Sequence, residues 1–193
     1  MHSDWPTRPS VAAEHAAPAS TERRTWLRGL LAASVAASAA GWPIVARANS
    51  LALGKPAPPL VLHTLDGHSI ATDDLRGQVV ILTFWATWCD PCREELPLLS
   101  AYAARHASQG LQVLGFSLDG PENLGAVRQV ATGLSFPVGL LGSAWAGDYG
   151  RMWRIPVSFA IDRSGRLAYN GWDDKQPVWT AESLERIVTP LLG

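Results

Sequence analysis

The hydrophobic and polar positions divide this chain into two parts with different patterns. Residues 1–22 are polar and rich in Ala, Pro and Ser, and an apolar stretch over 29–45 follows the pair Arg23-Arg24. From Asn49 onward, short apolar runs alternate with segments in which apolar residues recur at helical intervals. We therefore expect an N-terminal targeting segment followed by one folded domain.

Strand-like and helix-like segments alternate along residues 49–193. The run Val79 to Trp85 is almost continuously apolar, which predicts a central strand buried on both faces. After Pro91 the spacing becomes helical and ends at Gly110. The other predicted elements are a hairpin around Asp66-Gly67, a helical turn over 73–77, a strand over 111–118, a helix over 122–132, a strand over 136–141, a short helix over 144–153, a hairpin of 157–161 with 166–170, and a last helix over 181–192. This order predicts an α/β sandwich with a mixed sheet.

Composition and charge narrow the class of protein. The 193 residues are 47% apolar and 17% charged, which is typical of one globular domain with its own core. The formal net charge is −1, and no basic run is longer than Arg23-Arg24. We therefore expect no nucleic-acid partner.

Two cysteines, Cys89 and Cys92, are the whole cysteine content of the chain. A zinc site would need two further ligands at finger-like spacing, and His63, His68 and His106 do not provide that spacing, so we interpret them as surface or loop histidines. Arg93 follows the pair where covalent haem attachment needs histidine. We predict neither a metal site nor a cofactor.

The cysteine pair falls where a buried strand gives way to a helix. Pro91 suits a first helical turn, because its missing N–H would have no partner inside the helix. Cys89 is therefore expected at a helix N-terminus, where free N–H groups favour a thiolate, the nucleophile of disulfide exchange. Cys92, one turn later and nearer the core, would be the resolving thiol. A purely structural bond is the alternative interpretation, and it is disfavoured because so short a loop would constrain the unfolded chain little.

The surrounding residues carry a family resemblance. TlpA/ResA-like thioredoxin-fold reductases have an active-site segment similar to the run Phe84-Trp85-Ala86-Thr87-Trp88-Cys89-Asp90-Pro91-Cys92-Arg93-Glu94-Glu95-Leu96-Pro97. Their substrate loop resembles Arg154-Ile155-Pro156-Val157-Ser158-Phe159. The resemblance implies a thioredoxin fold, with a mixed central sheet flanked by helices, an N-terminal β-hairpin extension and a central helical insert.

The resemblance also implies roles for the residues near the pair. Cys89 would attack a client disulfide and Cys92 would resolve the mixed disulfide that results. Glu95 matches an acidic residue that could exchange protons with Cys92; an exposed helix carboxylate is the alternative interpretation. Cytoplasmic thioredoxins carry a buried Asp where this chain has Thr83, which increases the importance of Glu95.

Three further residues are assigned by the same resemblance. Pro156 would be cis and would present the backbone of Ile155 to an incoming client chain as a short β-like pairing. Trp88, beside the nucleophile, would shape the contact surface, whereas Trp85 would belong to the core. Val157 stands where the family often has Thr, so the polarity of the substrate-facing loop differs here.

The N-terminal segment predicts export. Arg23-Arg24 ahead of an apolar stretch resembles a twin-arginine signal, with the general secretory route as the alternative. The run Ala46-Arg47-Ala48 suits a signal peptidase, which divides the chain into a signal peptide, 1–48, and a thioredoxin-like domain, 49–193. Pro43 and the many alanines make a membrane span less suitable, and membrane anchoring would follow only if the signal stayed uncleaved. We expect a periplasmic protein.

Three functions compete for the cysteine pair. The leading hypothesis is a reductase of client proteins with cysteine pairs, of the cytochrome c or respiratory copper-site maturation type, kept reduced by a membrane-bound thiol electron donor. Asp90 between the cysteines adds negative charge and favours a reductant. The alternatives are a disulfide-donating oxidase and a Cu(I)-binding chaperone. A thiol peroxidase is disfavoured, because the pattern Pro-x-x-x-Thr-x-x-Cys is absent.

Overall fold

A computed structural model describes residues 51–193, and the predicted signal peptide lies outside these residues. Its centre is a five-stranded sheet in which β3 is flanked by β4 and β6, with β5 and β7 at the edges. Strands β3, β4 and β5 run parallel to one another, β6 runs antiparallel to β3, and β7 runs antiparallel to β6. The strands are β3 (Val79–Trp85), β4 (Leu111–Ser117), β5 (Val138–Leu140), β6 (Val157–Ile161) and β7 (Leu167–Asn170). This arrangement confirms the predicted mixed sheet.

Strand β3 places the sequence that follows it at a defined edge of the sheet. Every residue of β3 is buried, as the apolar run predicts. In register, Trp85 lies opposite Ser117 of β4 and Phe84 opposite Val157 of β6. The residues after β3, after β4 and before β6 therefore meet at one edge of the sheet, the edge formed by the ends of these strands rather than by an outer strand.

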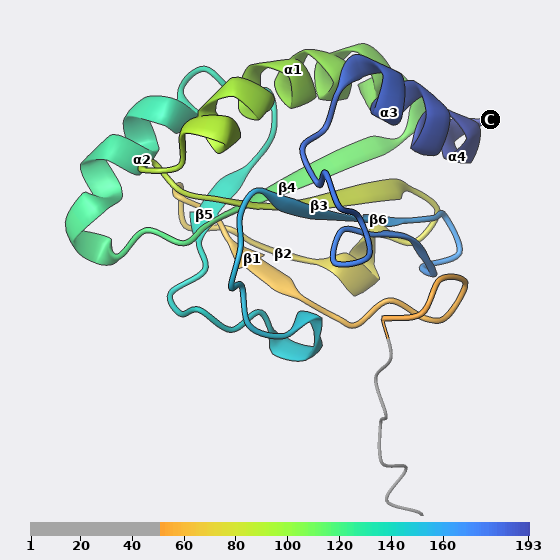
Figure 1. The fold of residues 1–193 in the computed structure, drawn as a ribbon, viewed down its shortest axis with the longest axis horizontal. Helices are drawn as coiled ribbons and strands as arrows, with labels where there is room; N and C mark the ends of the chain where they lie inside the picture. The colour runs from red at the N-terminus through yellow and green to blue at the C-terminus, as the bar shows by residue number, and fades with distance from the viewer. Residues whose placement is uncertain (1–50) are drawn as a thin grey trace, which may run out of the picture. The chain divides into compact units, whose positions relative to one another are not determined.

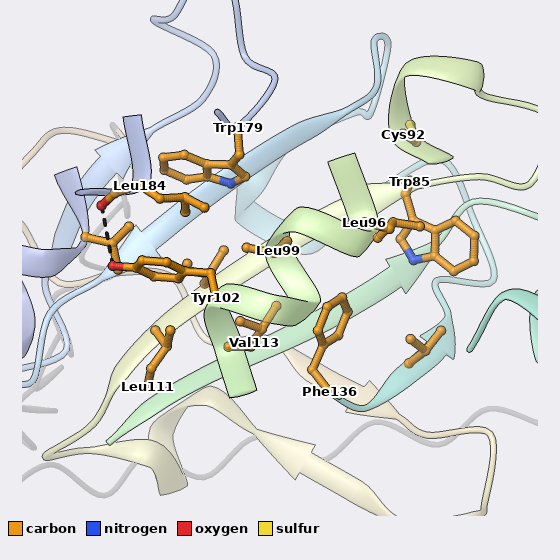
Figure 2. Packing of buried hydrophobic residues seen from close by; sticks show 14 of the residues in the cluster. Trp85, Cys92, Leu96, Leu99, Tyr102, Leu111, Val113, Phe136, Trp179 and Leu184 are labelled. Atoms are coloured by element: carbon orange, nitrogen blue, oxygen red, sulfur yellow. Dashed lines mark hydrogen bonds between the residues drawn. The ribbon is translucent and has the colours of Figure 1, made fainter. Parts of the chain in front are cut away.

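The helices pack against one face of this sheet (Figure 1). That face carries Val79, Ile81 and Trp85, which alternate along β3 with side chains of the other face. Leu96 and Leu99 of the longest helix lie over it, together with Trp179 from the chain before the last helices (Figure 2). The helices are α1 (Asp90–His106), α2 (Leu124–Ala131), α3 (Ala181–Ile187) and α4 (Thr189–Leu192).

The opposite face is covered by a hairpin and by loops. The predicted hairpin forms β1 (Val61–His63) and β2 (Ser69–Ala71), with Leu62 paired to Ile70. Leu62 packs among aromatic residues of the sheet and of the loops beside it, which are Phe84, Phe116, Tyr149 and Phe159. The predicted helical turn after the hairpin is a short 3₁₀ helix, Thr72–Leu75.

The central insert differs from the predicted helix over 144–153. It holds a single 3₁₀ turn, Gly147–Tyr149, inside a loop closed by a bridge between Trp145 and Arg151. Gly147 and Gly150 have φ values of 54° and 87°, which lie outside the right-handed helical region. Two left-handed positions so close together interrupt a helix, although Tyr149 still buries its ring in the core.

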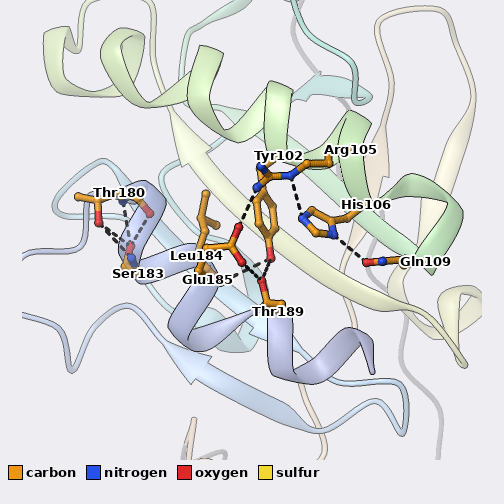
Figure 3. Close-up of polar contacts among 9 residues, drawn as sticks. All are labelled: Tyr102, Arg105, His106, Gln109, Thr180, Ser183, Leu184, Glu185 and Thr189. Carbon is orange, nitrogen blue, oxygen red and sulfur yellow. Dashed lines mark hydrogen bonds and ion pairs between the residues drawn. The ribbon is translucent and has the colours of Figure 1, made fainter.

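The predicted last helix is two helices. Pro190 has no N–H to donate to the carbonyl four residues earlier, which interrupts the helical hydrogen bonds near residue 188. Helix α3 begins with a capping box between Thr180 and Ser183. The two helices are attached to the end of α1, where the Tyr102 hydroxyl lies 2.8 Å from the Thr189 hydroxyl (Figure 3).

The interpretation of His106 as a surface or loop residue is wrong. His106 is the last residue of α1 and is buried, with its ring 4.3 Å from the Tyr102 ring. Arg105 Nε donates to His106 Nε2, and His106 Nδ1 lies 2.7 Å from Gln109 Oε1, so the neutral tautomer with the proton on Nδ1 satisfies both contacts (Figure 3). Over residues 51–193, none of the helices combines the length and the apolar character that a membrane span requires.

Candidate active site

The cysteine pair begins α1 at the edge where β3 ends. Cys89 is the N-cap of the helix, and its Sγ accepts the N–H of Cys92 at 3.3 Å. The two sulfurs form a disulfide with an S–S distance of 2.04 Å, so the structure shows the oxidised state. Pro91 lies in the first turn, as its missing N–H allows.

The two sulfurs differ in accessibility. Cys89 is 6% exposed, whereas Cys92 is fully buried against the core of the helix-bearing face. The free N–H groups and the dipole of the first helical turn favour an anion at the position of Cys89. The geometry therefore suits Cys89 for attack on an incoming disulfide and Cys92 for an internal second step.

Glu95 lies on α1, three residues after Cys92, and is only 2% exposed. Its Oε2 accepts the N–H of Trp179 at 2.8 Å. Burial raises the pKa of Glu95 from an ordinary 4.5 to about 7, and the Trp179 N–H and the nearby Thr83 hydroxyl partly oppose that shift. A buried carboxyl with this pKa can take up or release a proton near neutral pH.

Two hydroxyl groups lie beneath the start of α1. Thr83 of β3 and Ser158 of β6 are cross-strand partners, and both are fully buried. Neither hydroxyl reaches hydrogen-bond geometry with a partner among residues 51–193. Tyr169 is also near this region: its pKa is raised by burial first, then by Asp174, and also by the charge of Glu95.

The loop before β6 brings the second predicted motif to the same edge. The peptide bond between Ile155 and Pro156 is cis. Pro156 is buried and Ile155 half-buried, and Ile155 packs against the cores of both faces of the sheet. The next residue, Val157, pairs with Phe84 of β3, which places this loop beside the turn that leads to Cys89.

The tryptophans before the pair have opposite environments. Trp88 is 65% exposed, immediately before Cys89, whereas Trp85 is fully buried in the core. A large exposed aromatic side chain beside a reactive sulfur offers contact area to a partner. The structure thus brings Cys89, Cys92 and Glu95 together at the start of one helix.

Some residues of the site were missed from sequence. The donor to Glu95 is a backbone N–H at Trp179, and a backbone group leaves no signal in residue type. Asp119 was also missed: it is buried and accepts hydrogen bonds from Thr87. Its position just after a buried strand, at the same edge as the cysteine pair, was the signal that could have identified it.

Arg154, in the loop before Pro156, holds the chain after β7. Its guanidinium donates to the carbonyls of Gly171, Trp172 and Asp174 at 2.7 to 3.1 Å. This segment leads on to Trp179, whose N–H reaches Glu95. The loop before Pro156 is therefore attached to the strap, residues 171–179, which brings the Trp179 N–H to Glu95.

Comparison with known proteins agrees with this geometry. Residues 53–170 match the AhpC/TSA family. ResA, a thiol-disulfide oxidoreductase of Bacillus thuringiensis (strain Al Hakam), is 35% identical over 122 residues, which cover 62% of this chain and 69% of the relative. The chain belongs to the AhpC/TSA family, as a ResA-like thiol–disulfide oxidoreductase.

A second relative and a solved structure are also similar to this chain. ResA of Bacillus subtilis (strain 168) is 31% identical over 126 residues, covering 64% of this chain and 69% of that protein. A thiol:disulfide interchange protein of the thioredoxin family from Chlorobium tepidum TLS superposes with a TM-score of 0.59 and 30% identity, covering 72% of this chain and 97% of that one. The thioredoxin fold and the family resemblance seen in the sequence are confirmed.

Within the AhpC/TSA family, this ResA-like chain departs from the peroxidase pattern. Leu82 and Ala86 stand where Pro-x-x-x-Thr-x-x-Cys would require proline and threonine ahead of Cys89. Both residues are buried apolar side chains. A disulfide between Cys89 and Cys92 instead provides for two-electron exchange with another dithiol.

Proposed function

We propose that this oxidoreductase works as a reductase of client protein disulfides. The observation that carries the proposal is the buried Glu95 with a pKa of about 7, one helical turn from Cys92. An acidic neighbour disfavours a thiolate, and a reduced form that is less stabilised gives a lower reduction potential. Asp90 between the cysteines acts in the same direction.

The reaction proceeds in two exchange steps. The Cys89 thiolate attacks one sulfur of the client disulfide, which breaks the client S–S bond, forms a mixed disulfide and releases one client sulfur as a thiolate that takes a proton. Cys92 then gives its proton to the Glu95 carboxylate and attacks the sulfur of Cys89. The second client sulfur leaves and is protonated, so two electrons have passed from the enzyme dithiol to the client.

The client chain is proposed to dock at the shared edge. Ile155 would pair with it through backbone groups beside Pro156, as a short β-like addition. Trp88, exposed beside Cys89, would contact the client residues next to the cysteine. The shared location of these residues at one sheet edge supports this assignment.

The proposed setting is the periplasm. Residues 1–48 are proposed to be a twin-arginine signal cleaved after Ala48, and the clients to be cysteine pairs of apocytochrome c or of a respiratory copper site. A membrane-bound thiol donor would restore the dithiol. Replacing Arg23 and Arg24 with lysine should leave an uncleaved precursor in the cytoplasm, and normal export of that variant would refute the twin-arginine route.

Trapping tests the proposed roles of the cysteines. Cys92→Ser in the native compartment should accumulate a mixed disulfide through Cys89 to specific proteins, because the second step is blocked. Cys89→Ser is the matched control and should trap nothing. Mixed disulfides that form through Cys92 in the control would overturn the assignment.

The reduction potential tests the proposed direction. A reductase should have a value well below about −180 mV, and a value near −120 mV would identify an oxidase instead. Stoichiometric retention of Cu(I) together with negligible disulfide turnover would favour the copper chaperone. Either result would refute the proposed reductase.

A further inference from the structure

Asp119 lies just beyond β4 and is 2% exposed. Its Oδ2 accepts the N–H of Thr87 at 2.8 Å and the hydroxyl of Ser117 at 2.7 Å. Its Oδ1 accepts the Thr87 hydroxyl at 2.6 Å. Two of these three hydrogen bonds therefore end on one residue, and that residue lies two positions before Cys89.

The contacts of Asp119 begin where the regular sheet ends. Strands β3 and β4 are in register up to Trp85 and Ser117, and one more backbone bond joins the N–H of Leu118 to the Trp85 carbonyl at 2.8 Å. Beyond that bond the chain from β3 turns towards α1, with the Cys89 N–H bonded to the Ala86 carbonyl at 3.2 Å. The carboxylate continues the connection to β4 where backbone pairing stops.

A buried carboxylate is costly unless donors surround it, and three donors surround Asp119. The two oxygens take both polar groups of Thr87, the backbone N–H and the hydroxyl. Together they fix the turn of residues 86–88, which directs Trp88 to solvent and Cys89 to the helix start.

We propose that Asp119 is a positioning residue for the Cys89 thiol: by holding both polar groups of Thr87, it sets the turn that delivers Sγ to the N-terminus of α1. The inference rests on the proposed role of Cys89 as the attacking thiol. Asp119 itself touches neither sulfur through any hydrogen bond described above. Its effect reaches the chemistry through the turn, because thiolate stabilisation depends on where Sγ lies relative to the helix N–H groups.

Substitution by asparagine separates position from charge. In Asp119→Asn the amide oxygen can accept from the Thr87 N–H and the Ser117 hydroxyl, and the amide nitrogen can donate to the Thr87 oxygen. The clamp, which consists of the two hydrogen bonds between residue 119 and Thr87, is thereby kept without the charge. Asp119→Ala removes both the clamp and the charge, so the difference between these variants reports the clamp alone.

The measurement is the rate at which iodoacetamide alkylates Cys89 in the reduced full-length protein, in a Cys92→Ser background, from about pH 6 to 9. Asp119→Ala should slow alkylation at pH 7 about tenfold, which corresponds to a thiol pKa about one unit higher. Asp119→Asn should restore the rate to within about threefold of the parent. An equal loss in both variants would show that the hydrogen bonds that asparagine keeps do not set the reactivity of Cys89, and no loss in Asp119→Ala would show no role; either result overturns the proposal.

Two further variants keep the test decisive if Asp119→Ala fails to fold. Thr87→Val removes only the 2.6 Å bond to the turn and should slow alkylation about threefold. Ser117→Ala is the matched control, because it removes a donor to the Asp119 carboxylate and an acceptor of the Asp119 N–H, neither of which is on the turn, and it should leave the rate within about twofold. Equal rates for Thr87→Val and the parent, or equal losses in both variants, would overturn the proposal.

Mapping the alkylated residue in reduced wild-type protein separates the role of Cys89 from the role of Asp119. Modification of Cys89 is expected, because Cys92 is fully buried. Modification of Cys92 instead would refute the proposed attack by Cys89, whatever the Asp119 variants show. Modification of Cys89 with unchanged variant rates would refute only the role of Asp119.

Discussion

The two ends of α1 each carry a polar cluster, and the clusters are built in opposite ways. At the C-terminal end, Arg105 pairs with Glu185 at 2.8 Å, Glu185 also accepts from Thr189, and His106 has partners at both ring nitrogens (Figure 3). At the N-terminal end, the Glu95 carboxylate is held by a backbone N–H, and the buried hydroxyls beside it lack partners within residues 51–193.

This difference separates a cluster that holds the fold from one that is suited to chemistry. A satisfied network fixes the packing of α1 against α3 and α4. A buried carboxyl with few donors retains a raised pKa, which is costly for the fold and useful for moving a proton. Substitutions at the two ends of α1 test that contrast.

Glu95→Gln should change stability only where Glu95 is ionised. The folded-state pKa of Glu95, about 7, is above the ordinary 4.5, so the protonated carboxyl stabilises the folded wild-type protein. This contribution to the free energy of unfolding is fully present below about pH 4.5 and is lost as the pH rises through 7. The oxidised variant should therefore be more stable than wild type by about 3 kcal/mol at pH 8 and equal to it at pH 4. Urea unfolding measures both values, and the same difference at the two pH values would contradict the raised pKa.

Tyr102→Phe should weaken the far end of α1 to a smaller extent. It removes the hydrogen bond to Thr189 and should lower the free energy of unfolding by about 1 kcal/mol. Burial raises the pKa of the Tyr102 phenol, so the loss should be constant between about pH 5 and 8. Disulfide turnover should stay at the wild-type rate, and a reduced turnover in folded protein would break the contrast between the two ends.

Glu185→Gln should have the smallest effect. Its ion pair with Arg105 is more than half open to solvent on the arginine side and half open on the glutamate side, and such pairs contribute less than about 1 kcal/mol. The amide can still accept from Thr189. Unfolding in high salt should erase the remaining difference, whereas a loss that persists in salt would show that the hydrogen bond rather than the charge is responsible.

The sequence predicts the local elements of the site well, because their signals are local. The apolar run of β3, the cysteines three apart and the proline in the first turn lie within one stretch of chain. The position of Glu95 follows from its spacing to Cys92. Its burial does not, because the strap that carries Trp179 comes from 84 residues further along the chain.

Long-range and irregular features account for the predictions that failed. Asp119 and Thr87 are 32 residues apart, and their contact depends on the strand register. The segment over 144–153 buries every third residue, Ala146, Tyr149 and Met152, which is close to a helical spacing, although Gly147 and Gly150 set a loop. Local periodicity cannot distinguish these cases when tertiary packing decides the backbone.

The role of Glu95 is tested by following the two exchange steps separately. Reduced protein is mixed with the aromatic disulfide dithiobis(nitrobenzoate), which releases one coloured thiolate when Cys89 attacks and a second when Cys92 resolves the mixed disulfide. In wild type, the rate of the second release should rise with pH through about 7, following Glu95. Glu95→Gln should slow that release at least about tenfold at pH 7, with the first release within about twofold of wild type. An unchanged second release would contradict the role of Glu95 as the proton acceptor for Cys92.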